Sequence, residues 1–191
     1  MTKTLILLFH RDLAQSKANA ALARAAAAVP GVEVIDVQSE YPDGRIDFEA
    51  DGRREAERLL TADRIVLQFP IQWYSTPPLL KAWQDAVLTR MYYIFADTEG
   101  DKLEGTPLMI AATAGNIPGA YTRSGQNHFT VDEIFTPLKA TAHRCGLPWH
   151  EPYLVFEADR LAPDQLDQAA RGYASALKRF IAATSAERKA A

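Results

Sequence analysis

The sequence predicts one α/β domain in which helices cover both faces of a parallel β-sheet. Five short apolar runs alternate with segments of helical periodicity along the 191 residues. None of these runs shows clean polar alternation, as expected for strands that are buried on both faces. The predicted strands occupy residues 4–9, 33–37, 64–69, 108–113 and 153–156. We expect a single domain over residues 1–184 and a frayed tail over residues 185–191.

The first two predicted helices each connect one strand to the next. Residues 16–29 are rich in alanine and have one apolar face, and Pro30 and Gly31 end this helix. Residues 49–60 form a charged helix whose apolar side chains lie near its C-terminal end. Helices of this kind can cover the sheet while its strands stay parallel.

The third strand runs into an aromatic turn. Pro70 removes a backbone donor and is expected to end the strand. A helix follows, with Thr76 as its N-cap and Pro77 at its first helical position. Trp73 and Tyr74 lie between strand and helix, where open α/β sheets bind their ligands. Two adjacent aromatic residues there favour a site for a flat aromatic molecule.

The last two predicted helices complete the domain. Thr130 and Glu133 have the form of a capping box and open a helix that extends to about residue 145. Pro137 lies inside this helix and is expected to kink it or to delay its regular start. Pro163 starts a final helix that runs past residue 180.

Composition narrows the classes of function. The net charge of −3, with scattered basic residues, gives no electrostatic case for nucleic acid. Cys145 is the single cysteine, which fits a reducing compartment. The histidines show no ligand spacing, so we expect no metal site. The first apolar run is short and stops at residue 10, so we expect no signal peptide and a cytoplasmic protein.

Loops after the first, third and fourth strands should meet at the carboxyl edge of the sheet. The first loop, at residues 10–19, has no glycine, so it is neither a dinucleotide-binding turn nor a Walker loop. Its polar groups and free N–H groups at a helix start form a candidate anion site, with Arg11 and Lys17 nearby. A plain N-cap at Ser16 and a structural role for His10 stay open as alternatives.

The third loop, at residues 113–116, has small residues that let a ligand approach the backbone closely. The polar insertion at residues 116–129 carries Tyr121 and His128, which are either surface residues or donors to a developing oxyanion. An anion site, an aromatic platform and a glycine-lined shelf together fit a phosphorylated, flat, aromatic cofactor. Flavin is the natural candidate.

The chain resembles the flavodoxin-like NAD(P)H:quinone oxidoreductase family, especially its short bacterial branch. That branch includes general-stress quinone reductases and the ancillary proteins of glutathione-gated potassium-efflux systems. The most specific match is residues 70–81, which read P-I-Q-W-Y-S-T-P-P-L-L-K. Further matches lie at residues 16–19, 113–116, 127–130 and 137–142, in the same order along nearly the whole chain.

This resemblance implies a flavodoxin-like sheet in the order 2-1-3-4-5, with flavin bound between strands one and three. The first loop would hold the flavin phosphate, the second would line the isoalloxazine ring, and the third would contact its pyrimidine edge. The implied cofactor residues are His10, Ser16, Lys17, Ala18, Asn19, Pro70, Ile71, Gln72, Trp73, Tyr74, Thr113, Ala114, Gly115 and Asn116. Tyr121 and His128 would match the catalytic Tyr/His pair near the ring.

The expected activity is two-electron reduction of quinones by a ping-pong mechanism. NAD(P)H would give hydride to the flavin and leave, and a quinone would then accept it in the same place. FMN is the expected cofactor and FAD the alternative, while the choice between NADH and NADPH stays open. The family is dimeric, and an aromatic interface could come from Trp83, Met91, Tyr92, Tyr93 and Phe95, although Trp83 fits the core equally well.

Three other functions compete with this one. A regulatory subunit that docks on a potassium-efflux transporter, at the inner face of the membrane, is the alternative that the resemblance also supports. A one-electron flavodoxin carrier is disfavoured because the net charge of −3 is not strongly acidic. A receiver domain is disfavoured because the third strand ends in Pro70 and not in a phosphorylatable aspartate.

Overall fold

The structure is a computed structural model that describes the backbone of residues 2–190 and the side chains of residues 2–185. Five parallel strands form one sheet in the order β2-β1-β3-β4-β5, which confirms the predicted flavodoxin-like arrangement. Each strand lies close to its predicted span. The strands are β1 (Thr4–Leu8), β2 (Val32–Asp36), β3 (Arg64–Pro70), β4 (Leu108–Thr113) and β5 (Tyr153–Val155).

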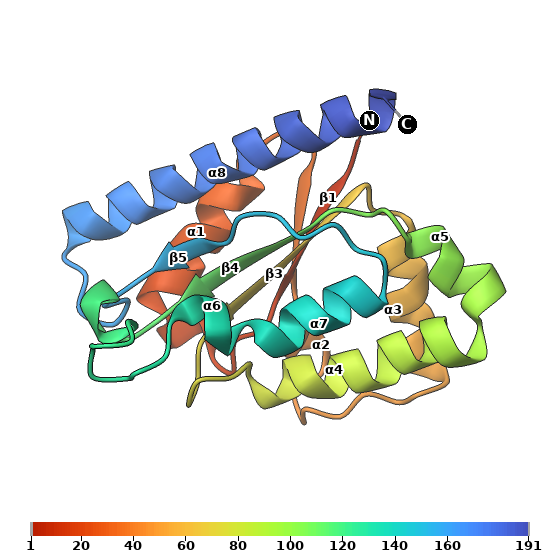
Figure 1. Cartoon of the computed structure of the whole chain (residues 1–191), viewed down its shortest axis with the longest axis horizontal. Coiled ribbons are helices and arrows are strands. Elements are labelled where there is room, and N and C mark those ends of the chain that lie inside the picture. Colours follow the sequence, from red (N-terminus) through yellow and green to blue (C-terminus); the bar gives the residue numbers. More distant parts are fainter. Residues whose placement is uncertain (1, 191) are drawn as a thin grey trace.

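Two helical layers cover the sheet, as Figure 1 shows. On one face, α1 and α8 pack against each other over a core cluster that includes Leu22 and Tyr173. On the other face, α3, α4 and α7 enclose a larger cluster around Trp83 and Leu138. The helices are α1 (Lys17–Ala27), α2 (Val37–Glu40), α3 (Ala50–Leu60), α4 (Pro78–Thr89), α5 (Asp101–Leu103), α6 (Val131–Ile134), α7 (Thr136–Arg144) and α8 (Pro163–Ala190).

The start of α4 differs from the prediction. Pro70 ends β3 as expected, as the last residue of the strand. The N-cap of α4 is Pro77 and its first residue is Pro78, so the prediction of Thr76 as N-cap is wrong. Thr76 and Pro77 each precede a proline. A residue before proline favours an extended conformation, because the proline ring clashes with its backbone in a helix. The helix therefore begins only after the second proline.

The helix expected over residues 130–145 is divided in two. Thr130 and Glu133 form the predicted capping box of α6. The chain then leaves helical geometry at Phe135 and continues as α7. Pro137 in the first turn of α7 explains the break, because its ring removes a hydrogen bond that a continuous helix would need.

The insertion after α4 is helical. Its turns η2 (Arg90–Ile94) and η3 (Ala96–Gly100) have π-helical hydrogen bonding and lead directly into α5. They leave Tyr93, Ile94 and Phe95 exposed at the surface. The insertion is therefore an ordered projection and not an open loop.

Helix α8 runs past residue 180, as predicted, and ends at Ala190. The frayed tail expected over residues 185–191 lies mostly outside the described side chains and stays a prediction. At its start, Ser185 accepts a hydrogen bond from the buried Arg64. Within residues 2–190, no helix is both long enough and apolar enough to cross a bilayer.

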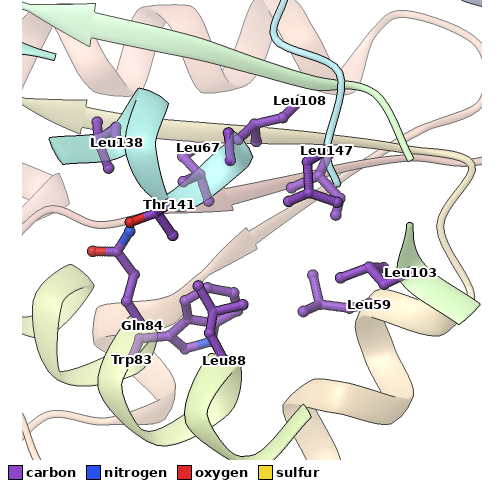
Figure 2. Close-up of a pocket in the computed structure, with 12 residues that line it drawn as sticks. Leu59, Leu67, Trp83, Gln84, Leu88, Leu103, Leu108, Leu138, Thr141 and Leu147 are labelled. Atoms are coloured by element: carbon purple, nitrogen blue, oxygen red, sulfur yellow. The ribbon is translucent and has the colours of Figure 1, made fainter. Parts of the chain in front are cut away.

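A small cavity lies in the larger core cluster, between the sheet and helices α3, α4 and α7. Its volume is about 30 Å³, and leucine side chains form most of its wall. Figure 2 shows Gln84 and Thr141 pointing toward each other at one side of it. It has room for about one water molecule. This cavity is a packing gap, and the candidate site lies elsewhere.

Candidate functional site

A cavity of about 510 Å³ opens at the carboxyl edge of the sheet, where the loops after β1, β3, β4 and β5 meet. We call it the cofactor cavity. The structure brings together most of the residues that the sequence assigned to a cofactor. Those that line the cavity are His10, Ser16, Lys17, Ala18, Asn19, Pro70, Ile71, Gln72, Thr113, Ala114 and Gly115.

The start of α1 forms one wall of the cofactor cavity. Ser16 is the N-cap, and its hydroxyl accepts a hydrogen bond from the backbone N–H of Asn19 over 3.2 Å. The N–H groups of Lys17 and Ala18 occupy the first helical positions, where no acceptor exists within the helix. These N–H groups and the Lys17 ammonium suit an anion, because the N-terminus of a helix carries partial positive charge.

His10 lies at the end of β1 and lines the same wall. Its Nδ1 accepts a hydrogen bond from the backbone N–H of Asp12 over 3.1 Å. Burial lowers the pKa of the imidazole, and the negative charge of the nearby Asp12 carboxylate only partly offsets this. His10 is therefore neutral near pH 7 with its proton on Nε2, so it can donate a hydrogen bond into the cavity.

A buried polar contact joins the first loop to the third. The side-chain amide of Asn19 donates to the hydroxyl of Thr113 over 3.0 Å, and both residues are buried. Gln68, which is also buried, donates to the backbone oxygen of Asn19 over 3.0 Å. The start of α1 and the end of β4 are thus fixed relative to each other. Both Asn19 and Thr113 line the cavity, so the contact holds these two parts of its wall together.

The second loop is a two-residue hairpin turn. Gln72 and Ser75 exchange backbone hydrogen bonds of 2.9 and 3.0 Å. Trp73 and Tyr74 occupy the central positions with φ of 46° and 61°. Two positive φ values define a type I′ turn, which normally takes Asn-Gly. Aromatic residues there are strained, and such strain is concentrated at functional sites.

The aromatic side chains of this turn do not line the cofactor cavity. Trp73 is 93% exposed and projects from the rim, and Tyr74 is 51% exposed. Only Ile71 and Gln72 of the turn face the cavity directly. The predicted platform therefore lies at the edge of the cavity and not inside it.

The loop after β5 contributes residues that the sequence analysis missed. Ala158 and Asp159 line the cofactor cavity. The backbone N–H of Ala158 donates to Ala114 over 3.1 Å, and that of Glu157 donates to Asn116 over 3.2 Å. The one signal in the sequence was the position of this loop, since it follows a fifth parallel strand and must emerge at the same edge.

Tyr121 and His128 lie on the insertion beside the cofactor cavity and do not line it. Tyr121 is half-buried and packs against Phe156, with ring centroids 5.6 Å apart. Burial raises the pKa of Tyr121, the nearby Tyr74 acts in the same direction, and a backbone hydrogen bond from Asn116 opposes them. The Tyr121 hydroxyl is therefore a neutral donor at all physiological pH values.

His128 is exposed and has a positive φ of 59°. Its Nδ1 lies 3.4 Å from the backbone oxygen of Arg123. Asn116 is half-buried, and its side chain bonds to Gln126 of the same insertion. These residues form the outer rim of the site, on the side of the third loop.

The donor set of the cofactor cavity fits a flavin. A phosphate suits the N–H groups and ammonium at the start of α1. The small residues of the third loop leave the backbone open to a flat ring, and a Cβ placed on Gly115 would meet only Asp159, at 3.7 Å. Among residues 2–185, no three His, Cys, Asp or Glu side chains come together as metal ligands.

Comparison with known proteins agrees with this fold. A family model described as a flavodoxin-like fold, Flavodoxin_2, matches residues 2–179. The chain belongs to this family. One relative in it is the glutathione-regulated potassium-efflux system ancillary protein KefG of Serratia proteamaculans (strain 568), which is 35% identical over 92% of this chain and 93% of its own.

Two solved structures are similar to this member of the Flavodoxin_2 family. General stress protein 14 of Treponema denticola, in complex with FMN, has a TM-score of 0.81 and 31% identity, covering 93% of this chain and 98% of its own. An NADPH-quinone reductase from P. pentosaceus has a TM-score of 0.75 and 27% identity, covering 91% and 96%. The relatives thus match the Flavodoxin_2 chain over nearly its full length.

Proposed function

We propose that this protein is a flavin-dependent NAD(P)H:quinone oxidoreductase that works by a ping-pong mechanism. The observation that carries the proposal is the cofactor cavity at the carboxyl edge of the sheet, which is lined both by the anion donors at the start of α1 and by the small residues of the third loop. The similarity to an NADPH-quinone reductase supports the same activity. A bound flavin supplies the chemistry, because it accepts hydride from a nicotinamide and gives it to a quinone.

The first loop would hold the phosphate of the cofactor. The N–H groups of Lys17 and Ala18 and the Nε2–H of His10 are its proposed donors, with Lys17 adding charge. Asn19 acts indirectly, because its amide is bound to Thr113 and its role is to hold the wall in place. We propose FMN over FAD because the general stress protein 14 structure contains FMN.

The second and third loops would position the ring. Ile71 and Gln72 line the cavity, as do Thr113, Ala114 and Gly115 of the third loop. Tyr121 and His128 are the proposed catalytic donors toward negative charge that develops at the pyrimidine edge. The exposed Trp73 and Tyr74 form the rim against which a flat substrate can stack.

The decisive experiment is to identify and test the cofactor. The purified protein is expected to be yellow, and mass spectrometry of the released cofactor should give FMN. Without oxygen, NAD(P)H should bleach the flavin absorbance, and a quinone added afterwards should restore it. A reconstituted protein that stays colourless and binds neither FMN nor FAD in titration calorimetry would overturn the proposal.

The proposed assembly is a homodimer. The candidate interface is the exposed segment of Tyr93, Ile94 and Phe95. Two cations pack against its rings: the Arg90 guanidinium lies 4.0 Å from the centre of the Phe95 ring, and that of Arg144 lies 5.2 Å from the centre of the Tyr93 ring. Exposed aromatic residues of this kind are typical of an interface core.

A second candidate function is an ancillary subunit of a potassium-efflux transporter, favoured by the similarity to KefG. The protein would then act in the cytoplasm at the inner face of the membrane. Sedimentation with vesicles that contain such a transporter, compared with vesicles that lack it, tests this function. Equal sedimentation with both kinds of vesicle would exclude it.

A further inference from the structure

A second cavity lies beside the aromatic turn. Its volume is about 450 Å³, and it shares no lining residue with the cofactor cavity. The exposed rings of Tyr74 and Phe129 line it, and Ile134 and Pro137 add apolar surface. We call it the Phe129 cavity. Two exposed aromatic faces beside a cavity of this size suit a flat ring.

Two hydrogen bonds attach the Phe129 cavity to the rim of the cofactor site. The hydroxyl of Tyr74 donates to Oδ1 of Asn127, and the amide of Asn116 donates to Oε1 of Gln126, both over 3.2 Å. Because these contacts use the amide oxygens, the NH₂ groups of Gln126 and Asn127 are left to donate. Neither has an acceptor in the described part of the chain. Such donors match the ring acceptors of a purine.

Positive charge lies next to this cavity, on Arg123, which does not itself line it. Glu133 lines it and forms an ion pair with Arg123, whose side chain is 75% exposed. The other oxygen of Glu133 accepts hydrogen bonds from the backbone and the hydroxyl of Thr130. The carboxylate is thus fully engaged, while the exposed guanidinium of Arg123 retains donors that can meet a phosphate.

We propose that the Phe129 cavity binds the adenine end of NAD(P)H. This inference rests on the proposed function, in which the nicotinamide end lies over the cofactor cavity. A quinone has one reacting ring, and that ring must reach the cofactor. A second cavity, lined by other residues than the cofactor cavity, therefore adds nothing to quinone binding. A dinucleotide has a second aromatic ring joined through phosphates, so it has a separate ring for each of the two cavities. The affinity for NAD(P)H and the affinity for the quinone would then depend on different residues.

The direct test is titration calorimetry of adenosine monophosphate into the flavin-loaded protein. Phe129→Ala should weaken binding about tenfold, which corresponds to about 1.4 kcal/mol, because stacking against the ring is lost. Ile117→Ala is the matched control, since Ile117 is a similarly exposed apolar residue of the same insertion that does not line the cavity. No binding, or equal binding by both variants, would overturn the inference.

Steady-state kinetics separate this inference from the proposed function. Phe129→Ala should raise KM for NAD(P)H and leave KM for the quinone unchanged, and adenosine monophosphate should compete with NAD(P)H alone. Competition with the quinone instead would assign the cavity to the acceptor and defeat the inference. If NAD(P)H fails to bleach the wild-type flavin, the proposed function itself fails. Gln126→Leu, which removes a donor at an exposed position, provides a second variant with the same expected pattern.

Discussion

Asn19 and Thr113 are 94 residues apart in the sequence, yet a buried hydrogen bond of 3.0 Å joins their side chains. The bond connects the first turn of α1 to the last residue of β4, and both residues line the cofactor cavity. An amide donor buried at this position is costly to leave without an acceptor. The pair therefore links the shape of the cavity to the stability of the fold.

Thr113→Val should destabilise the protein by about 1–3 kcal/mol, because it keeps the shape of the side chain and leaves the Asn19 amide without its acceptor. Flavin binding should weaken as well, since the wall formed by α1 loses its attachment. Urea unfolding and flavin titration measure the two effects. Thr136→Val, at an exposed position in α7, is the control and should change neither. Equal stability of both variants would show that the buried contact contributes nothing.

Much of the site could be predicted because parallel strands bring their carboxyl ends to one edge. That rule alone predicts that the loops at residues 10–19 and 113–116 meet at this edge, and residues of both loops line the cofactor cavity. The conformation of Trp73 and Tyr74 could not be predicted, because large side chains disfavour positive φ and local propensity argues against it. Asp159 was missed because the loop after β5 carries no motif, and only its backbone bonds bring it to the cavity.

Trp73→Gly should raise the free energy of unfolding by about 0.5–1 kcal/mol, because glycine relieves the strained turn position and the exposed ring buries little surface. The same change should lower turnover, since the rim loses a stacking face. Chemical denaturation and steady-state quinone reduction measure these opposite effects. Trp73→Ala removes the ring and keeps the strain, so it should lose activity without gaining stability. A destabilised glycine variant would contradict the strain argument.

Tyr121→Phe should slow the bleaching of the flavin by NAD(P)H, by up to about 10²–10³-fold if the hydroxyl acts like an oxyanion-hole donor. The packing against Phe156 is kept, so the fold should not change. Stopped-flow absorbance under anaerobic conditions measures the rate. Tyr173→Phe is the matched control. The buried Tyr173 hydroxyl has no partner among the described residues, and it lies in the core cluster covered by α1 and α8. An unchanged rate would remove Tyr121 from the mechanism.

Ile94→Asp should convert the proposed dimer into a monomer, because it places a charge in the middle of the exposed apolar segment at residues 93–95. Sedimentation velocity at micromolar concentration measures the change. Ile117→Asp alters an exposed isoleucine outside that segment and should leave the dimer intact. A wild-type protein that sediments as a monomer would rule out the homodimer, and dissociation of both variants would rule out this interface.

His10 should make the fold less stable in acid. Burial lowers its pKa in the folded protein below the unfolded value of 6.5, so the unfolded state binds the proton more readily. The contribution of the neutral imidazole to the free energy of unfolding is fully present above pH 6.5. It is lost as the pH falls through the lowered pKa of the folded state. His10→Asn should therefore show a smaller fall in unfolding free energy between pH 7 and pH 5 than the wild type. Denaturant unfolding at the two pH values measures this, with His143→Asn, on the exposed side of α7, as the control. An identical fall in the wild type and in His10→Asn would mean that the imidazole is as accessible to protons in the folded protein as in the unfolded chain.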